Sequence, residues 1–110
     1  MQIRKTYVNV KPDLLFNEIK DFGVKEGATL GENRLETMAL STDSSGFISR
    51  GTLVFLNSSG KQCIRAHLVG VAGGETKLMI DTDDSVFPPE KTKALMDDVD
   101  FIFDSYEKQS

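Results

Sequence analysis

The spacing of hydrophobic and polar residues predicts a strand followed by a helix at the start of the chain. Residues 2–10 are rich in β-branched and aromatic side chains and alternate roughly in polarity, which is typical of a strand. Pro12 suits the first turn of a helix, where its missing N–H costs nothing. We expect this helix to run from residue 12 to residue 22 or 26. Its buried stripe consists of Leu15, Phe16, Ile19 and Phe22.

From residue 28 to residue 82 the hydrophobic period switches to two, which predicts an antiparallel meander. Clusters of turn-forming residues at 43–46, 57–60 and 72–74 separate its strands. Residues 28–30 can form a further short strand, with a turn or bulge at 31–33. The four main strands expected are Leu35–Ser41, Phe47–Leu56, Cys63–Val71 and Thr76–Thr82.

The last predicted element is a helix that opens at Pro88 and Pro89 and continues to about Tyr106. Helical spacing predicts one buried stripe and, elsewhere on the helix, a solvated acidic ridge. The stripe consists of Leu95, Met96, Val99, Ile102, Phe103 and Tyr106, and the ridge of Asp97, Asp100 and Asp104.

The element order is therefore β-α-β-β-β-β-α, an α+β class in which a curved antiparallel sheet carries both helices on one face. Residues 1–110 are expected to form a single domain. This order resembles the TATA-box-binding-protein fold in a single copy, and the helix-grip fold of the START and Bet v 1 proteins. The helix-grip resemblance implies a cavity between the sheet and the last helix. The resemblance to the DNA-binding fold implies a basic, aromatic sheet surface, which we do not find in this sequence.

Composition narrows the functional classes. The chain has 13 Lys+Arg against 17 Asp+Glu, a net charge of −4. No cluster of basic residues offers the phosphate contacts that nucleic acid requires, so we expect no nucleic-acid partner. One cysteine excludes an internal disulfide, and no apolar run reaches the roughly 18 residues of a membrane span. We expect a cytoplasmic protein without a membrane partner.

The sequence offers no catalytic constellation, and we expect no enzyme, cofactor or metal site. Cys63 and His67 are four residues apart on one strand, about 13 Å, too far for a nucleophile and its base. Residues 81–85 begin like a calcium loop, but Val86 stands where glycine is needed and Thr92 where glutamate is needed. An isomerase or cyclase that uses His67 is a third, weaker hypothesis.

The predicted hairpin through residues 57–60 pairs positions whose numbers add to 117, which brings Gly51 opposite Ala66. We expect Leu68 opposite Leu78 in the next hairpin. For strand 35–41 two registers remain, and we favour the one that turns Met38 and Leu40 inward. The outer face then has Arg50 beside His67 and Met79, and Thr52 beside Arg65 and Asp81. This face is either a contact surface or a solvated sheet with an Arg65–Asp81 ion pair.

Two functions compete. The first is a non-enzymatic interaction module that binds itself as a homodimer or binds another protein. Its contact surface would be the outer sheet face with Arg50, Thr52, Arg65, His67 and Met79, or an apolar helix patch with Leu14, Val24 and Phe101. The alternative is a carrier of a small apolar ligand. Its cavity would be lined by Ser49, Gly51, Ala66, Met96 and Phe103.

Overall fold

The computed structural model, which describes residues 1–39, 47–71 and 74–107, has the predicted two-layer α+β architecture. Its elements follow the predicted order and end with a short 3₁₀ helix, η1. They are β1 (Gln2–Val8), α1 (Pro12–Lys25), β2 (Thr29–Ala39), β3 (Phe47–Leu56), β4 (Gln62–Val71), β5 (Glu75–Thr82), α2 (Pro89–Phe103) and η1 (Asp104–Tyr106).

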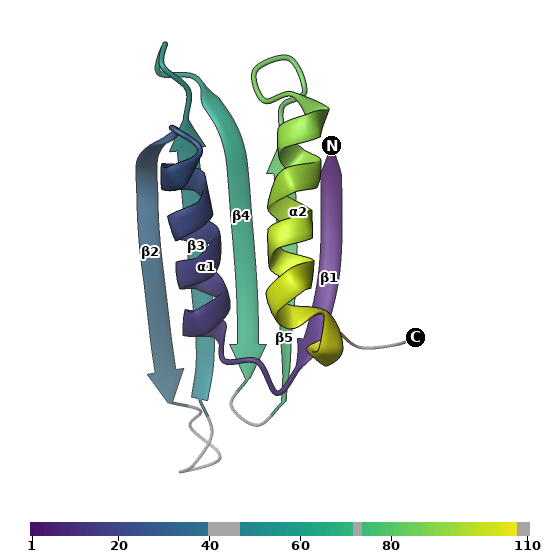
Figure 1. Cartoon of the computed structure of the whole chain (residues 1–110). Helices are drawn as coiled ribbons and strands as arrows, with labels where there is room; N and C mark the ends of the chain where they lie inside the picture. The colour runs from purple at the N-terminus through teal and green to yellow at the C-terminus, as the bar shows by residue number, and fades with distance from the viewer. Residues whose placement is uncertain (40–46, 72–73, 108–110) are drawn as a thin grey trace.

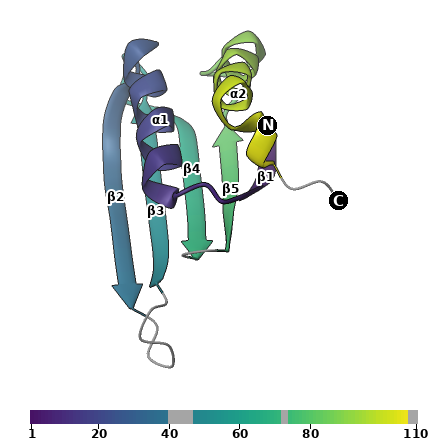
Figure 2. The same ribbon diagram turned by 60° about the horizontal axis from the view of Figure 1, so that its bottom comes forward.

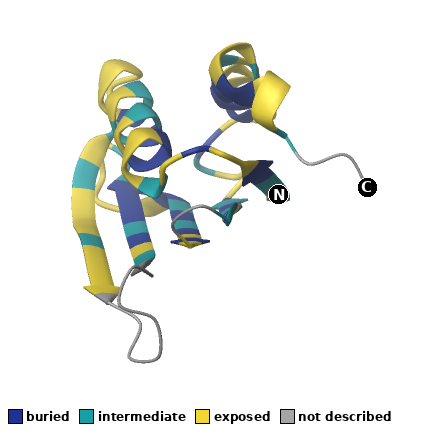
Figure 3. Cartoon of the chain, turned by 90° about the horizontal axis from the view of Figure 1, so that it is seen from below, coloured by how far each residue is buried: buried dark blue, intermediate teal, exposed yellow. Residues whose placement is uncertain are grey.

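The five strands form one antiparallel sheet in the order β1-β5-β4-β3-β2. Both helices pack on the same face of this sheet, α1 over β2, β3 and β4, and α2 over β5 and β1 (Figures 1 and 2). The helices run antiparallel to each other, so the start of α1 lies at the same end of the molecule as the end of α2 (Figure 1). Among the residues that the structure describes, no helix covers the opposite face of the sheet (Figure 3).

The strand registers can be compared with the predicted registers residue by residue. The β4–β5 register is confirmed, with Leu68 opposite Leu78. The β3–β4 register is wrong by two, because Gly51 lies opposite Leu68 and not Ala66. A bulge between Phe55 and Leu56 accompanies this shift. An even shift keeps each side chain on its predicted face, so the core residues are unaffected.

The preferred register of the edge strand is wrong. In β2, Leu35 lies opposite Gly51 and points to the helices, whereas Met38 is exposed on the open face. Leu40 lies outside the described residues. The short strand and bulge predicted around residues 28–33 join β2 as one strand with a register shift between Leu30 and Asn33. The bulge and the charged Glu32, Arg34 and Glu36 make this edge a poor template for another strand.

Close approach of α1 to the sheet depends on Gly51. A Cβ there would lie 2.7 Å from Phe16 Cδ2 and 2.8 Å from Leu68 Cδ1, so the Phe16 ring occupies the space above the glycine. On α2, the side chains of Leu95, Met96, Val99 and Phe103 are buried as predicted, but Ile102 and Tyr106 are exposed. Ile102 lies at the edge of the stripe. Tyr106 belongs to η1, where about three residues per turn replace the α-helical 3.6.

Candidate functional site

The open face of the sheet arranges polar and apolar side chains in rows across the strands. Thr52 lies opposite His67, His67 opposite Met79, and Met79 opposite Arg4. The predicted neighbourhood of His67 and Met79 is thus confirmed. The predicted neighbourhood of Arg50 and His67 is wrong, because the two-residue register shift moves Arg50 one row further along the sheet.

In the next row of residues across the strands, basic residues lie on both sides of the exposed Val69. Arg50 lies opposite Val69, and Val69 lies opposite Lys77. Within the described residues, no carboxylate lies at ion-pair distance from Arg4, Arg50 or Lys77. Exposed apolar side chains continue this surface toward the β1–α1 end of the sheet, namely Val8, Met38 and Val71.

His67 is held on this face by two hydrogen bonds. Arg65 Nε donates to His67 Nε2 at 2.9 Å, so Nε2 carries no proton and the neutral ring is protonated on Nδ1. Nδ1 then donates to Thr52 Oγ1 at 3.3 Å. Arg65 lies opposite Asp81 as predicted, but the described residues contain no ion pair between them. Both ring nitrogens of His67 are therefore engaged in holding the sheet surface together.

Beside His67 the open face is hollowed. The hollow has a volume of about 360 Å³, within the range of small binding pockets. Its lining includes the cations Arg4 and Lys77 and the apolar side chains of Val69 and Met79, so it suits an apolar side chain flanked by carboxylates. We call it the basic hollow, and its lining residues are Arg4, Lys5, Thr6, His67, Val69, Lys77, Leu78 and Met79.

A second exposed apolar feature lies on α2. The side chain of Phe101 is 90% exposed, and helical spacing places Asp97 and Asp104 beside it on the helix surface. We call these three residues the Phe101 surface. The Asp97 carboxylate accepts a hydrogen bond from Lys93 at 2.9 Å. An exposed aromatic ring with carboxylates one helical turn away complements the cations that line the basic hollow.

The predicted helix patch is not continuous. Leu14, in the first turn of α1, and Phe101, in the last turn of α2, lie at the same end of the molecule. Val24 is exposed as predicted, but it lies ten residues from Leu14 along α1, about 15 Å away. Leu14 and Val24 therefore cannot contact one small partner together with Phe101.

The residues predicted to line a ligand cavity do not enclose open space around Gly51. Phe16 and Leu68 fill the position above it. Ser49 donates to, or accepts from, Thr37 at 2.9 Å, which ties β3 to β2. The other three residues are closely packed in the hydrophobic core: Ala66, Met96 and Phe103.

Cys63 and the acidic turn have local structural roles. The Cys63 thiol donates to the Phe55 carbonyl at 3.4 Å, and burial raises the pKa of the thiol, which disfavours a thiolate nucleophile. The Asp83 carboxylate accepts from Ser85 Oγ at 2.6 Å and from the Ser85 backbone N–H at 3.0 Å. These hydrogen bonds lower the pKa of Asp83 and shape the turn before α2.

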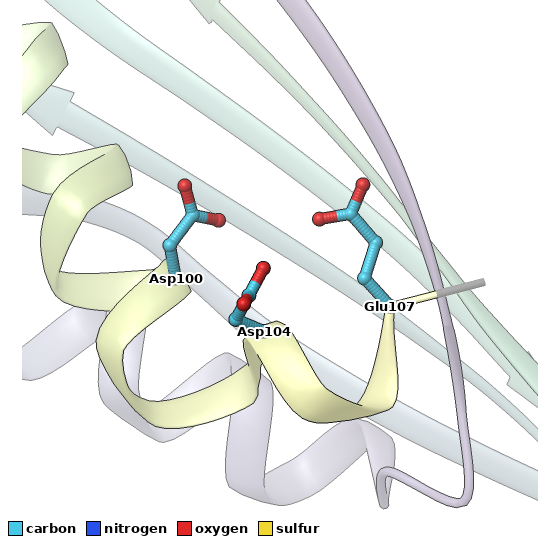
Figure 4. A group of neighbouring side chains, drawn as sticks. All are labelled: Asp100, Asp104 and Glu107. Atoms are coloured by element: carbon cyan, nitrogen blue, oxygen red, sulfur yellow. The ribbon is translucent and has the colours of Figure 1, made fainter. Parts of the chain in front are cut away.

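Two carboxylate groupings were missed by the sequence analysis. At the end of α2 the carboxylates of Asp100, Asp104 and Glu107 converge (Figure 4). Asp100, predicted on a solvated ridge, is half-buried because it faces Lys5 of β1. The available sequence signal is the spacing of residues 100, 104 and 107, which places the three on one face of a helix. That spacing alone predicts a solvated ridge, because nothing in the local sequence shows that β1 lies beside α2.

The other grouping joins the two helices. Glu18 of α1 and Asp98 of α2 face each other, and Asp98 Oδ2 is buried without a hydrogen-bond partner among the described residues. Burial, and then a hydrogen bond to Asp98 and the charge of Asp98, raise the pKa of Glu18. No sequence pattern pairs residues 18 and 98, since they meet only when both helices dock on one sheet face.

Comparison with known proteins adds no relative. No protein-family model, no curated protein and no solved structure matches this chain. The resemblance to helix-grip and TATA-box-binding folds thus stays a prediction from element order. Across the part of the chain that the structure describes, the helices are too short and too polar to cross a membrane.

Proposed function

We propose that this protein is a non-enzymatic interaction module that self-associates by docking the Phe101 surface of one copy into the basic hollow of another. The observation that carries the proposal is the opposite chemistry of the two exposed features. Phe101 is exposed, with Asp97 of α2 and Asp104 of η1 one helical turn away. The hollow on the open sheet face combines valine and methionine with Arg4 and Lys77, which have no carboxylate partner among the described residues.

Charge favours a head-to-tail contact over a symmetric one. A two-fold contact centred on the basic hollow would bring Arg4 and Lys77 near their own copies. A two-fold contact between the α2 helices would oppose the acidic surfaces. Like charges at close range disfavour both arrangements, whereas the head-to-tail contact pairs opposite charges. It also places an aromatic ring beside Arg and Lys side chains, which adds cation–π attraction.

The contact is testable with two complementary variants. Phe101→Ala removes the inserted ring and leaves the hollow intact, whereas Lys77→Glu reverses a charge on the hollow and leaves the Phe101 surface intact. In analytical ultracentrifugation we expect the wild type to gain mass with concentration. Each variant should weaken association about tenfold or more, equivalent to about 1.4 kcal/mol.

Mixing the variants separates a head-to-tail contact from a symmetric one. An equimolar mixture should form a one-to-one complex, because the hollow of the Phe101→Ala copy can still accept the Phe101 surface of the Lys77→Glu copy. Lys61→Glu, an identical charge reversal at an exposed turn, serves as the matched control and should behave like wild type. Wild-type mass in both variants, or no complex in their mixture, would contradict the proposal.

A further inference from the structure

Three carboxylates converge where α2 ends, in a position that is electrostatically unfavourable for them. The oxygens of Asp100, Asp104 and Glu107 that could bind an ion all lie within 4.8 Å of one another, and their side chains turn to the same side of the chain (Figure 4). The last turn of α2 contains no basic residue. The negative end of the helix dipole therefore adds to the repulsion among the three groups.

Lys5 of β1 offsets only part of this charge. Its Nζ donates to Glu107 Oε1 at 3.1 Å and lies 3.8 Å from Asp100 Oδ1. One cation against three carboxylates leaves a local charge of about −2. Because a lysine side chain has four rotatable bonds, the Lys5 ammonium can move away when a divalent cation binds the carboxylates.

A buried tyrosine supplies an independent indication of a ligand. Tyr7 is fully buried, and its hydroxyl has no hydrogen-bond partner among the described residues. The ring packs edge-on against Phe103, with centroids 6.1 Å apart, and the Tyr7 backbone pairs with Glu107. Tyr7 and Lys5 are two residues apart and so share one face of β1, which places the Tyr7 ring beside the lysine that contacts Asp100 and Glu107.

Asp100 contributes a second incompletely satisfied atom. Its Oδ1 is buried and accepts no hydrogen bond from the described residues, and Lys5 Nζ lies 3.8 Å from it, at the distance of a long ion pair. A donor without a hydrogen-bond partner and an acceptor with only this long ion pair, beside a surplus of negative charge, are both satisfied by one hydrated cation. The acceptor would ligate the ion, and the tyrosine hydroxyl would donate to an ion-bound water or to a ligating carboxylate.

We propose that Asp100, Asp104 and Glu107 form a binding site for a hard divalent cation of the Ca²⁺ class, with the buried Tyr7 side chain beside it. Oxygen-only ligands without histidine or cysteine select hard cations over Zn²⁺. The site is half-exposed and leaves several coordination positions to water. A dissociation constant of about 10⁻⁴–10⁻³ M is expected, as in other weak calcium modules. This proposal does not depend on the proposed self-association.

The chain itself provides a probe, because it contains two tyrosines and no tryptophan. Tyrosine excitation should sensitise Tb³⁺ luminescence at the site, with saturation at one ion per chain and displacement by Ca²⁺. Calorimetric titration with Ca²⁺ gives the same affinity without relying on tyrosine. Both measurements use the Phe101→Ala variant as well as wild type, so that failure of self-association does not affect the result.

Matched variants distinguish the site from general surface acidity. The double variant Asp100→Asn with Asp104→Asn should weaken Ca²⁺ binding at least tenfold. Glu90→Gln, which removes an exposed carboxylate in the first turn of the same helix, should leave Ca²⁺ binding unchanged. Lys5→Met should strengthen binding several-fold, because the competing ammonium is gone. Equal losses in the Glu90 and the double variant, or no saturation up to about 10 mM Ca²⁺, ten times the upper end of the expected range, would overturn the proposal.

Discussion

At the scale of single residues, the packing of α1 against the sheet depends on Gly51 having no side chain. We expect Gly51→Ala to destabilise the fold by about 1–3 kcal/mol, because the added methyl group meets the Phe16 ring and Leu68. Chemical denaturation of both proteins measures the difference. Gly74→Ala is the control, since a Cβ there has only ordinary contacts at 3.5 Å or more. Equal stability of the Gly51 variant and wild type would show that α1 can move away from the sheet at no cost.

Met96 tests the carrier hypothesis at the same scale. If the core under α2 is closely packed, Met96→Ala should cost about 2–5 kcal/mol, because truncation leaves a cavity between helix and sheet. A pre-existing ligand cavity would make the loss much smaller. Thermal or urea unfolding with and without an apolar dye separates these outcomes. We expect the large loss, since Met96 belongs to the buried core cluster.

At the scale of elements, the contact between α1 and α2 should be sensitive to pH through Glu18 and Asp98. The folded state raises the pKa of Glu18, so it binds a proton that the unfolded chain releases. This contribution to stability is present at acidic pH and is lost as the pH rises from the ordinary glutamate range through the raised pKa. Asp21 adds to the repulsion, and Lys25 opposes it.

Glu18→Gln should therefore be more stable than wild type at pH 7, because the amide can donate to Asp98 Oδ2 without carrying a charge. The difference should shrink toward acidic pH, where wild-type Glu18 is protonated. Unfolding at a series of pH values measures it as variant minus wild type, which cancels the other titrating groups. Glu26→Gln, at the exposed end of α1, should show no such pH-dependent difference.

Elements and their faces were predictable from sequence, whereas their exact alignment was not. The period of two places Leu53 and Leu68 on one face whichever even register is used. The β3–β4 register itself depends on a bulge at Phe55, for which the sequence has no clear signal. Met38 was expected inside because its size complements Gly51, but Phe16 from α1 fills that space. Packing between segments that are distant in sequence therefore determines both the β3–β4 register and the face on which Met38 lies.

The candidate site was likewise predictable from the sequence only in part. The composition of the open face was predictable because alternation assigns Arg50, Arg65 and His67 to it. The hydrogen bond from Arg65 to His67 was not, since an ion pair with Asp81 was the simpler expectation. Phe101 was recognised as outward-facing from helical spacing alone. Its relation to the basic hollow emerges only when the two surfaces are compared on the folded molecule.

At the scale of the whole molecule, the two exposed surfaces carry opposite charge on a chain whose net charge is −4. Screening should therefore weaken self-association, because the Debye length falls from about 10 Å at 0.1 M salt to about 3 Å at 1 M. We expect sedimentation-derived masses to move toward the monomer as sodium chloride increases. Arg50→Gln, which removes a cation beside Val69, should reduce both the association and its salt dependence.

Association that instead strengthens with salt would indicate a contact dominated by apolar burial, such as one through Val8, Val71 and Met38, because salting-out favours apolar contacts. With such an apolar contact, Phe101→Ala would weaken association only if the Phe101 ring is part of that contact. The salt series and the mixing experiment together thus test which surface mediates the proposed contact between copies.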